Sequence, residues 1–248
     1  MRLFFLLFSA LALLTACQQQ PPRAVAAICP VTVKADSDTT AASPNKTAIE
    51  RRIEAQGLRD IAEEIPEVRI SLMYGRADNF TGRVLYTDLH HAYLHPEAIT
   101  ALRKAAKALA KERADLALIV FDAARPMAIQ QRMWDVVRGT AQQNYVSNPA
   151  HGGGLHNYGL AVDISLCQRA TGDTIAMGTV VDHLGRLAHV REEATFRQRR
   201  QISATALANR RLLRRVMSAG GWRVLPTEWW HFNLRTRAQA KAHYQVIP

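Results

Sequence analysis

The chain has 248 residues, of which 48% are hydrophobic and 21% are charged, with a formal net charge of +11. This length and composition allow one well-packed catalytic domain with terminal additions. They exclude a low-complexity or wholly disordered protein.

The first residues have the form of an export signal. Arg2 precedes an apolar run, Leu3 to Leu14, that is too short to span a bilayer. Leu14-Thr15-Ala16-Cys17 then resembles the bacterial lipoprotein signal, in which the cysteine is acylated. We expect residues 1–17 to be this signal, ending at a lipidated Cys17, with a plain secretory signal as the alternative. Gln18 after the cysteine favours a periplasm-facing lipoprotein of the outer membrane.

Residues 18–48 are rich in Gln, Pro, Ala, Ser and Thr and lack sustained periodicity. This composition predicts a flexible tether between the lipid anchor and a domain at 49–248. Two further cysteines remain, Cys29 and Cys167. The oxidising envelope permits a disulfide between them, and Cys167 fits a small buried hydrophobic residue equally well.

Hydrophobic periodicity predicts the secondary structure of the domain. Helices are expected at 49–65, 96–113, 127–138 and 205–219, and strands at 68–72, 116–121, 156–166 and 228–234. There is no internal repeat and no regular βαβ alternation. The pattern therefore predicts an α+β fold with a small, mostly antiparallel central sheet flanked by helices.

Basic residues crowd between Arg186 and Arg215. A solvated helix face is the favoured interpretation, and weak attraction to anionic cell-wall or lipid surfaces is the alternative. Nucleic acid is the usual partner of such a segment. An exported lipoprotein has little access to it, so we do not expect a nucleic-acid partner.

Two separated motifs carry metal-site chemistry. His156 and Asp163 lie seven residues apart after the loop Gly152-Gly153-Gly154, and Glu228 lies three residues before His231. Imidazole nitrogen and carboxylate oxygen are ordinary zinc ligands, and a catalytic site uses three of them with one position open. Positions i and i+3 of a regular strand face opposite sides, so we predict a bulge, kink or strand end that turns Glu228 and His231 toward one site.

Further polar residues follow predicted strands and turns. Asp122 and Arg125 stand where a buried strand ends, and Asp182 ends the turn Met177-Gly178-x3-Asp182. The block Tyr74-x4-Asn79-Phe80-Thr81-Gly82 is a polar turn flanked by aromatic residues.

Together these motifs resemble the zinc D-Ala-D-Ala metallopeptidases. His156-x2-Gly159-x-Ala161-x-Asp163 and Glu228-x2-His231 carry the likeness, and Asp122-x2-Arg125-Pro126 narrows it to the VanX-like D-alanyl-D-alanine dipeptidases. The resemblance spans roughly residues 50–234 and implies the fold of that superfamily.

The resemblance implies a role for each matching residue. His156, Asp163 and His231 match ligands of one Zn²⁺ per chain, and Glu228 matches the general base. Arg125 matches the arginine that stabilises the tetrahedral intermediate. The remaining matches concern the substrate: Tyr74 and Asp182 would hold its free amino terminus, and Asp122 would support Arg125 or the amine.

One position departs from the family pattern. Relatives carry a serine two residues before the first histidine ligand, where this chain has Gly154. The expected function is hydrolysis of D-Ala-D-Ala, or a similar short D,D-dipeptide, in peptidoglycan metabolism of a bacterial envelope. The alternatives are a D,D- or L,D-carboxypeptidase acting on stem peptides, and a non-catalytic lipoprotein that binds peptidoglycan.

Overall fold

The structure, a computed structural model, describes residues 46–248. The expected signal with Cys17, the residue Cys29 and the tether up to residue 45 lie outside the described residues. Lys46 and Thr47 belong to the folded part, because Thr47 caps the first helix and Lys46 pairs with Glu54. No helix within 46–248 is long and apolar enough to cross a membrane.

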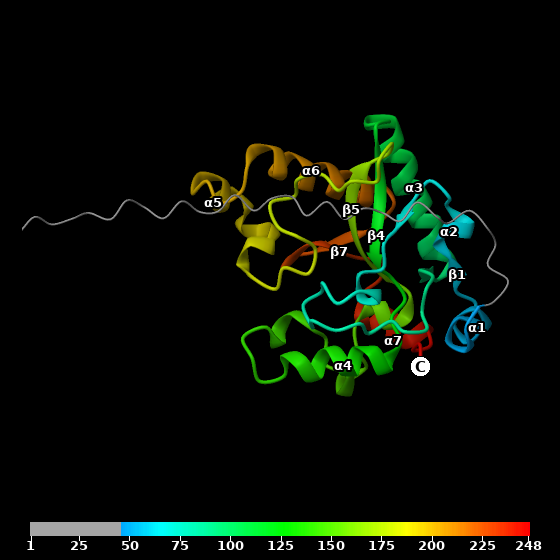
Figure 1. Cartoon of the computed structure of the whole chain (residues 1–248). Helices are drawn as coiled ribbons and strands as arrows, with labels where there is room; N and C mark the ends of the chain where they lie inside the picture. Colours follow the sequence, from blue (N-terminus) through cyan, green and yellow to red (C-terminus); the bar gives the residue numbers. More distant parts are fainter. Residues whose placement is uncertain (1–45) are drawn as a thin grey trace, which may run out of the picture. The chain divides into compact units, whose positions relative to one another are not determined.

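A five-stranded sheet in the order β2-β4-β5-β7-β6 forms the centre (Figure 1). Its strands are β2 (Arg69–Ile70), β4 (Leu116–Asp122), β5 (Ala161–Gln168), β6 (Arg223–Leu225) and β7 (Glu228–Asn233). Strands β2 and β4 are parallel, and the other neighbouring pairs are antiparallel. The predicted α+β fold with a mostly antiparallel central sheet is confirmed.

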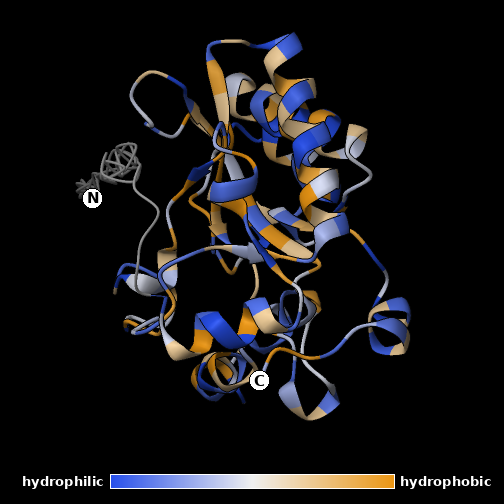
Figure 2. Cartoon of the chain, turned by 90° about the vertical axis from the view of Figure 1, so that its right-hand side faces the viewer, coloured by the Kyte–Doolittle hydropathy of each residue, from blue (hydrophilic) through white to orange (hydrophobic). Residues whose placement is uncertain are grey.

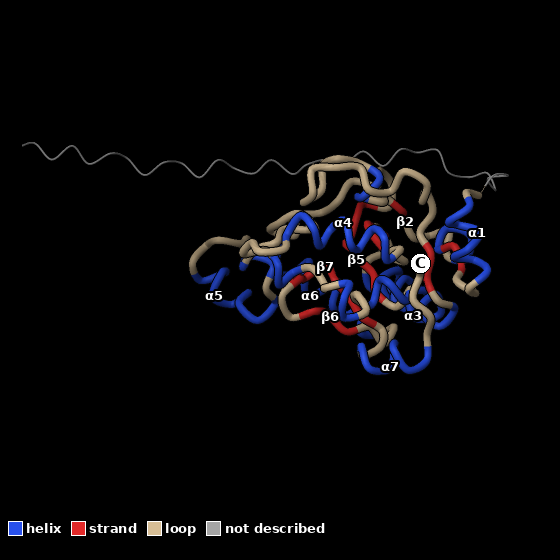
Figure 3. The backbone as a smooth tube through the Cα atoms, turned by 90° about the horizontal axis from the view of Figure 1, so that it is seen from below, coloured by secondary structure: helices blue, strands red, loops and turns tan. Residues whose placement is uncertain are grey.

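The helices cover both faces of this sheet. They are α1 (Ala48–Ala55), α2 (Ile61–Glu64), α3 (Pro96–Glu112), α4 (Met127–Val137), α5 (Glu193–Gln198), α6 (Ala204–Ala219) and α7 (Arg237–His243). Figure 3 shows α4 on one side of β5 and β7, with α6 and α3 toward the other. The longer helices carry both hydrophilic and hydrophobic residues, as amphipathic helices do (Figure 2).

Alternation along β4 builds two hydrophobic cores. Leu116, Leu118 and Val120 pack with α3 and α6 in one cluster, whereas Ala117, Ile119 and Phe121 pack with α4 in the other. Successive side chains of a strand point to opposite faces, so a strand that is apolar throughout serves both layers. Cys167 on β5 lies fully buried in the second core, where burial raises the pKa of its thiol to about 11. It packs as a small apolar side chain, and its pairing with Cys29 stays a prediction.

Two predicted elements were wrong in detail. The helix expected at 49–65 is two helices, because Gly57 adopts a left-handed φ of +87° and Arg59–Asp60 then forms strand β1, paired with β3 (Tyr93–Leu94). The strand expected from His156 begins only at Ala161. His156 lies instead in the 3-10 turn Leu155–Tyr158, which Gly159 ends at a φ of +64°.

The basic segment is only partly a solvated face. Arg191, Arg197 and Arg211 are exposed, as expected, but Arg210 on α6 is fully buried. Its Nε donates to the Met177 carbonyl at 2.7 Å and its Nη2 to the Leu187 carbonyl at 3.0 Å. Arg210 therefore joins both ends of the loop that carries Asp182.

Replacing Arg210 tests this buried anchor. Arg210→Ala leaves two buried loop carbonyls without a donor and Glu193 with Arg214 as its one remaining described cation, so we expect the free energy of unfolding to fall by about 3–5 kcal/mol. Urea unfolding followed by circular dichroism measures this. Arg211→Ala, on the exposed side of the same helix, is the matched control and should change it by about 0.5 kcal/mol or less. Equal losses in the two variants would contradict the anchoring role.

Candidate active site

Strand register places three site residues in a row across the sheet. Asp122 on β4 is paired with Asp163 on β5, and Asp163 is paired with His231 on β7. These residues come from sequence positions up to 109 apart, and antiparallel pairing brings their side chains to the same end of the sheet. His156 joins the row from the turn that precedes β5.

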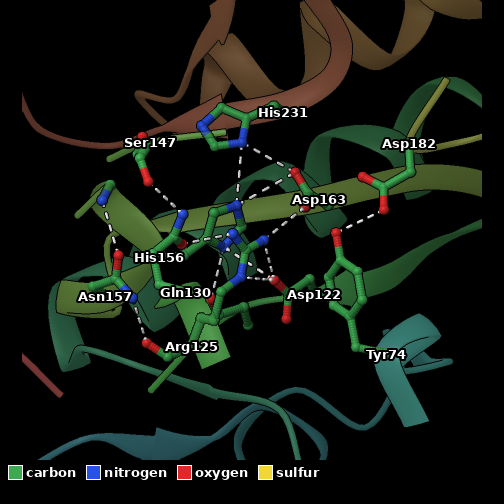
Figure 4. A network of polar contacts seen from close by, with 12 residues as sticks. Tyr74, Asp122, Arg125, Gln130, Ser147, His156, Asn157, Asp163, Asp182 and His231 are labelled. Carbon is green, nitrogen blue, oxygen red and sulfur yellow. Dashed lines mark hydrogen bonds and ion pairs between the residues drawn. The ribbon is translucent and has the colours of Figure 1, made fainter. Parts of the chain in front are cut away.

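The three candidate metal ligands converge. His231 Nδ1 lies 3.0 Å from Asp163 Oδ1, and His156 Nε2 lies 3.1 Å from His231 Nδ1 and 3.4 Å from Asp163 Oδ1 (Figure 4). Among the described residues this is the group of three or more such side chains that could hold a metal ion. The structure thus brings together the three residues that the sequence motifs selected.

The outer nitrogen of each imidazole fixes its tautomer. His156 Nδ1 lies 2.7 Å from the Ala123 carbonyl, which can only accept, so this nitrogen carries the proton and donates. On the other ring, His231 Nε2 lies 2.9 Å from Asn233 Oδ1 and donates in the same way. In the neutral rings, both facing nitrogens then present lone pairs to the Asp163 carboxylate. Two lone pairs and a carboxylate at this distance suit a bound cation.

Charge in the triad favours a carboxylate at Asp163. Burial disfavours its ionised form, yet the charge and hydrogen bonds that the two imidazoles supply when they are protonated outweigh burial and hold the pKa of this carboxyl well below its usual range. Asp163 is therefore a carboxylate at neutral pH, as a ligand must be.

Arg125 is held rigidly beside the triad. Its Nε and Nη2 donate to Asp122 Oδ2 at 2.9 and 2.5 Å, and its Nη1 donates to Gln130 Oε1 at 2.9 Å. The hydroxyl of Tyr86 donates to the other Asp122 oxygen at 2.6 Å. Burial opposes the charge, but Asp122 raises the pKa of Arg125 above its ordinary value, so it stays protonated. Of the two roles predicted for Asp122, the structure shows support of Arg125.

Tyr74 and Asp182 form a second polar pair in the cavity. The Tyr74 hydroxyl donates to Asp182 Oδ2 at 2.6 Å, and the Arg125 guanidinium lies 5.3 Å from the Tyr74 ring centre. Asp182 has a left-handed φ of +64°, which aspartate tolerates better than most residues. Burial and then Asp163 raise the pKa of Asp182 to about 7. A bound ammonium group would stabilise its ionised form.

Glu228 reaches the site through the predicted bulge. Val224 of β6 pairs with Phe232 and Leu225 with Glu228, so residues 229–231 of β7 have no one-to-one partner on β6. Both Glu228 and His231 then line one cavity, and Trp229 and Trp230 are buried in the core. Burial raises the pKa of Glu228 to about 8, since no hydrogen bond to a described residue stabilises its carboxylate.

The cavity measures about 300 Å³, a size that admits a small ligand. All the candidate metal, catalytic and substrate-binding residues line it except Asp122, which is fully buried and accepts hydrogen bonds from Arg125 in the cavity lining. Its polar lining comprises Tyr74, Arg125, Gln130, Tyr145, Ser147, His156, Asp163, Asp182, Glu228, His231, Asn233, Arg235, Thr236 and Arg237.

Three supporting residues were missed in the sequence. Asn233 lies two positions after His231 on the same strand face, which is a signal that could have found it. Gln130 is a polar residue on the buried face of α4, where it accepts a hydrogen bond from Arg125. Asn157 accepts from the Gly154 N–H and donates to the Arg125 carbonyl, both at 2.8 Å, and only the folded loop reveals that link.

Comparison with known proteins agrees with this geometry. Residues 54–248 match the sequence model of the peptidase M15 family, described as D-Ala-D-Ala dipeptidase. The chain belongs to this family. The predicted membership among the D-alanyl-D-alanine dipeptidases is thereby confirmed, and the protein is a hydrolase of a metallopeptidase family.

Two dipeptidases of this family are similar over most of their length, and a third over a shorter part. A D-alanyl-D-alanine dipeptidase of Escherichia coli is 32% identical over 177 residues, covering 71% of this chain and 84% of the relative. One of Streptomyces coelicolor is 27% identical over 209 residues, covering 74% of this chain and 94% of the relative. A dipeptidase of Enterococcus faecium matches a shorter part, 29% identical over 89 residues, covering 36% of this chain and 41% of the relative.

Proposed function

We propose that this protein is a zinc-dependent dipeptidase, with one Zn²⁺ per chain, that hydrolyses D-Ala-D-Ala or a similar short D,D-dipeptide in peptidoglycan metabolism. The observation that carries the proposal is the convergence of two imidazole nitrogens and a carboxylate beside Arg125 and Glu228 in one small cavity. The names of the similar dipeptidases support the substrate class.

The donor set favours zinc. Two imidazoles and one carboxylate, with room for a further ligand, form a common catalytic zinc set, and no cysteine lies among the lining residues. His156, Asp163 and His231 would hold the ion. Bound zinc supplies Lewis-acid chemistry to a peptide carbonyl and to water.

Glu228 would act as the proton carrier. Its carboxylate accepts a proton from the attacking water and returns it to the departing amine nitrogen. Its pKa of about 8, raised by burial, gives the carboxyl an affinity for protons suited to both transfers near neutral pH.

Arg125 would stabilise the oxyanion that forms when water adds to the carbonyl. Three of its five N–H groups donate to Asp122 and Gln130, leaving one on each terminal nitrogen without a hydrogen bond to a described residue. The Nη2 atom also lies 3.6 Å from Asp163 Oδ2, which directs this end of the guanidinium toward the triad. Because the guanidinium is already fixed, it stabilises developing negative charge without reorganising.

Asp182 and Tyr74 would select the amino end of the substrate. A free ammonium is the natural partner of a half-buried carboxylate that accepts one hydrogen bond from Tyr74. This arrangement favours a dipeptide over an internal residue of a longer chain, which has no charged amine at that position.

The test is hydrolysis by the zinc-loaded full chain. We expect release of D-alanine from D-Ala-D-Ala, loss of activity on removing zinc, and recovery when zinc is restored. Glu228→Gln should lower kcat by about 10² to 10⁴-fold, because it removes the proton carrier. Glu67→Gln, at an exposed position, is the control and should keep activity. Hydrolysis of a stem pentapeptide without hydrolysis of the dipeptide would instead favour a carboxypeptidase, and a zinc-loaded protein that cleaves neither would favour the binding lipoprotein.

We also propose that the chain is anchored in the bacterial envelope through Cys17, facing the periplasm and held in the outer membrane. Leu14-Thr15-Ala16-Cys17 supports this placement. Exposed arginines such as Arg197 and Arg211 would add weak attraction to anionic cell-wall surfaces.

Cys17→Ser tests the anchor. The variant cannot be acylated, so we expect it to leave the membrane fraction when envelope fractions are compared by immunoblot. Cys167→Ser, which keeps Cys17, is the control and should stay with the membrane. Membrane retention of the Cys17 variant would contradict lipid anchoring.

A further inference from the structure

Gly154 is not required by its backbone. Its φ of −109° and ψ of −174° are extended, a conformation open to any residue, whereas the preceding Gly152 and Gly153 have φ values of +83° and +64°. The constraint on Gly154 is steric. A Cβ at this position would lie 2.8 Å from Ser147 Oγ and 3.3 Å from Ser147 Cβ. The Ser147 side chain thus fills the space that a side chain at 154 would take.

Ser147 is fixed by the network that holds Arg125. Its carbonyl accepts from Gln130 Nε2 at 2.8 Å, and Gln130 Oε1 accepts from Arg125 at 2.9 Å (Figure 4). Its hydroxyl forms no hydrogen bond with any residue of 46–248, although Ser147 lines the cavity. A hydroxyl held in place without a protein partner can serve a ligand.

The charges of the cavity indicate which end of a dipeptide meets Ser147. The acidic lining residues are Asp163, Asp182 and Glu228. In Figure 4 Ser147 lies on the far side of Arg125 and His156 from Asp182 and Tyr74. Leu155, Arg235 and Arg237 are among the remaining lining residues, and none of these three is acidic. The two charged ends of an extended dipeptide lie about 7 Å apart. If the ammonium binds at Asp182, the carboxylate therefore lies toward the opposite end of the cavity, where Ser147 is.

We propose that Ser147 is a specificity-determining residue: its hydroxyl, in the space that a side chain at Gly154 would fill, donates a hydrogen bond to the terminal carboxylate of the dipeptide. The inference rests on the proposed function for the identity of the substrate. The hydroxyl that binds the carboxylate then comes from a loop residue nine positions before His156. Ser147 can occupy this space only because residue 154 has no side chain.

The experiment measures steady-state kinetics of the zinc-loaded full chain with D-Ala-D-Ala and its C-terminal amide. Ser147→Ala should raise KM for the dipeptide about tenfold or more with little change in kcat, because a charge-assisted hydrogen bond is lost. It should affect the amide less. Ser218→Ala, on the exposed end of α6, is the control. An unchanged KM, or an equal rise for both substrates, would overturn the proposal.

Exchanging the residues at positions 147 and 154 distinguishes a loss of substrate binding from a loss of folding. Gly154→Ser alone should weaken binding through crowding against Ser147, and Ser147→Gly alone through loss of the hydroxyl. The double variant S147G/G154S restores a hydroxyl in the same space, so its KM should return close to that of the unchanged protein. A double variant no better than S147G, with an intact thermal transition, would overturn the proposal.

Calorimetry can measure the affinity for D-Ala-D-Ala without hydrolysis, if the zinc-loaded protein carries Glu228→Gln and so lacks the proton carrier. There, Ser147→Ala should weaken binding of the dipeptide by the same factor. If the unchanged protein fails to cleave the dipeptide but this binding difference persists, only the proposed reaction fails. If Ser147→Ala leaves binding unaltered, the role of Ser147 fails whatever the reaction is.

Discussion

Two hydrogen bonds between the end of β4 and His156 hold the site together. The Arg125 N–H donates to the His156 carbonyl at 3.0 Å, and His156 Nδ1 donates to the Ala123 carbonyl at 2.7 Å. One bond fixes the backbone that carries Arg125, and the other fixes the tautomer that leaves His156 Nε2 unprotonated. The candidate metal ligand and the candidate oxyanion donor therefore share one support, and neither can move without the other.

The cavity gathers three acidic side chains within a basic protein. Asp163, Asp182 and Glu228 line it, while the chain as a whole carries a formal charge of +11. Burial raises the pKa of Glu228 to about 8 and that of Asp182 to about 7, so both carboxyl groups readily take up protons near neutral pH. A metal ion at the triad and an ammonium at Asp182 would replace those protons. This preference explains why the site suits a small substrate with a free amino end.

Sequence patterns predicted the parts of the site that lie within motifs. Residue type and spacing carry chemical information, and this pointed to His156, Asp163, His231, Glu228 and Arg125. The elements β4 and α3 were predicted because a long stretch with regular hydrophobic spacing specifies its secondary structure clearly. The turn around His156 was missed, since a glycine with positive φ interrupts an otherwise strand-like run. Ser147 and Asn157 could not be found, because their roles depend on how loops pack rather than on local periodicity. Arg210 was misjudged for the same reason: its charge suggested solvent, and only the fold shows the carbonyls that surround it.

The central claim is that two imidazoles and one carboxylate, presented by β5, β7 and the turn before β5, bind one zinc ion. X-ray absorption spectroscopy of the zinc-loaded protein tests it most directly. The account predicts two imidazole nitrogens at about 2.0–2.1 Å with oxygen as the remaining donors, and one imidazole fewer in His231→Ala. An imidazole count that stays the same in that variant, or a site coordinated by oxygen alone, would contradict it.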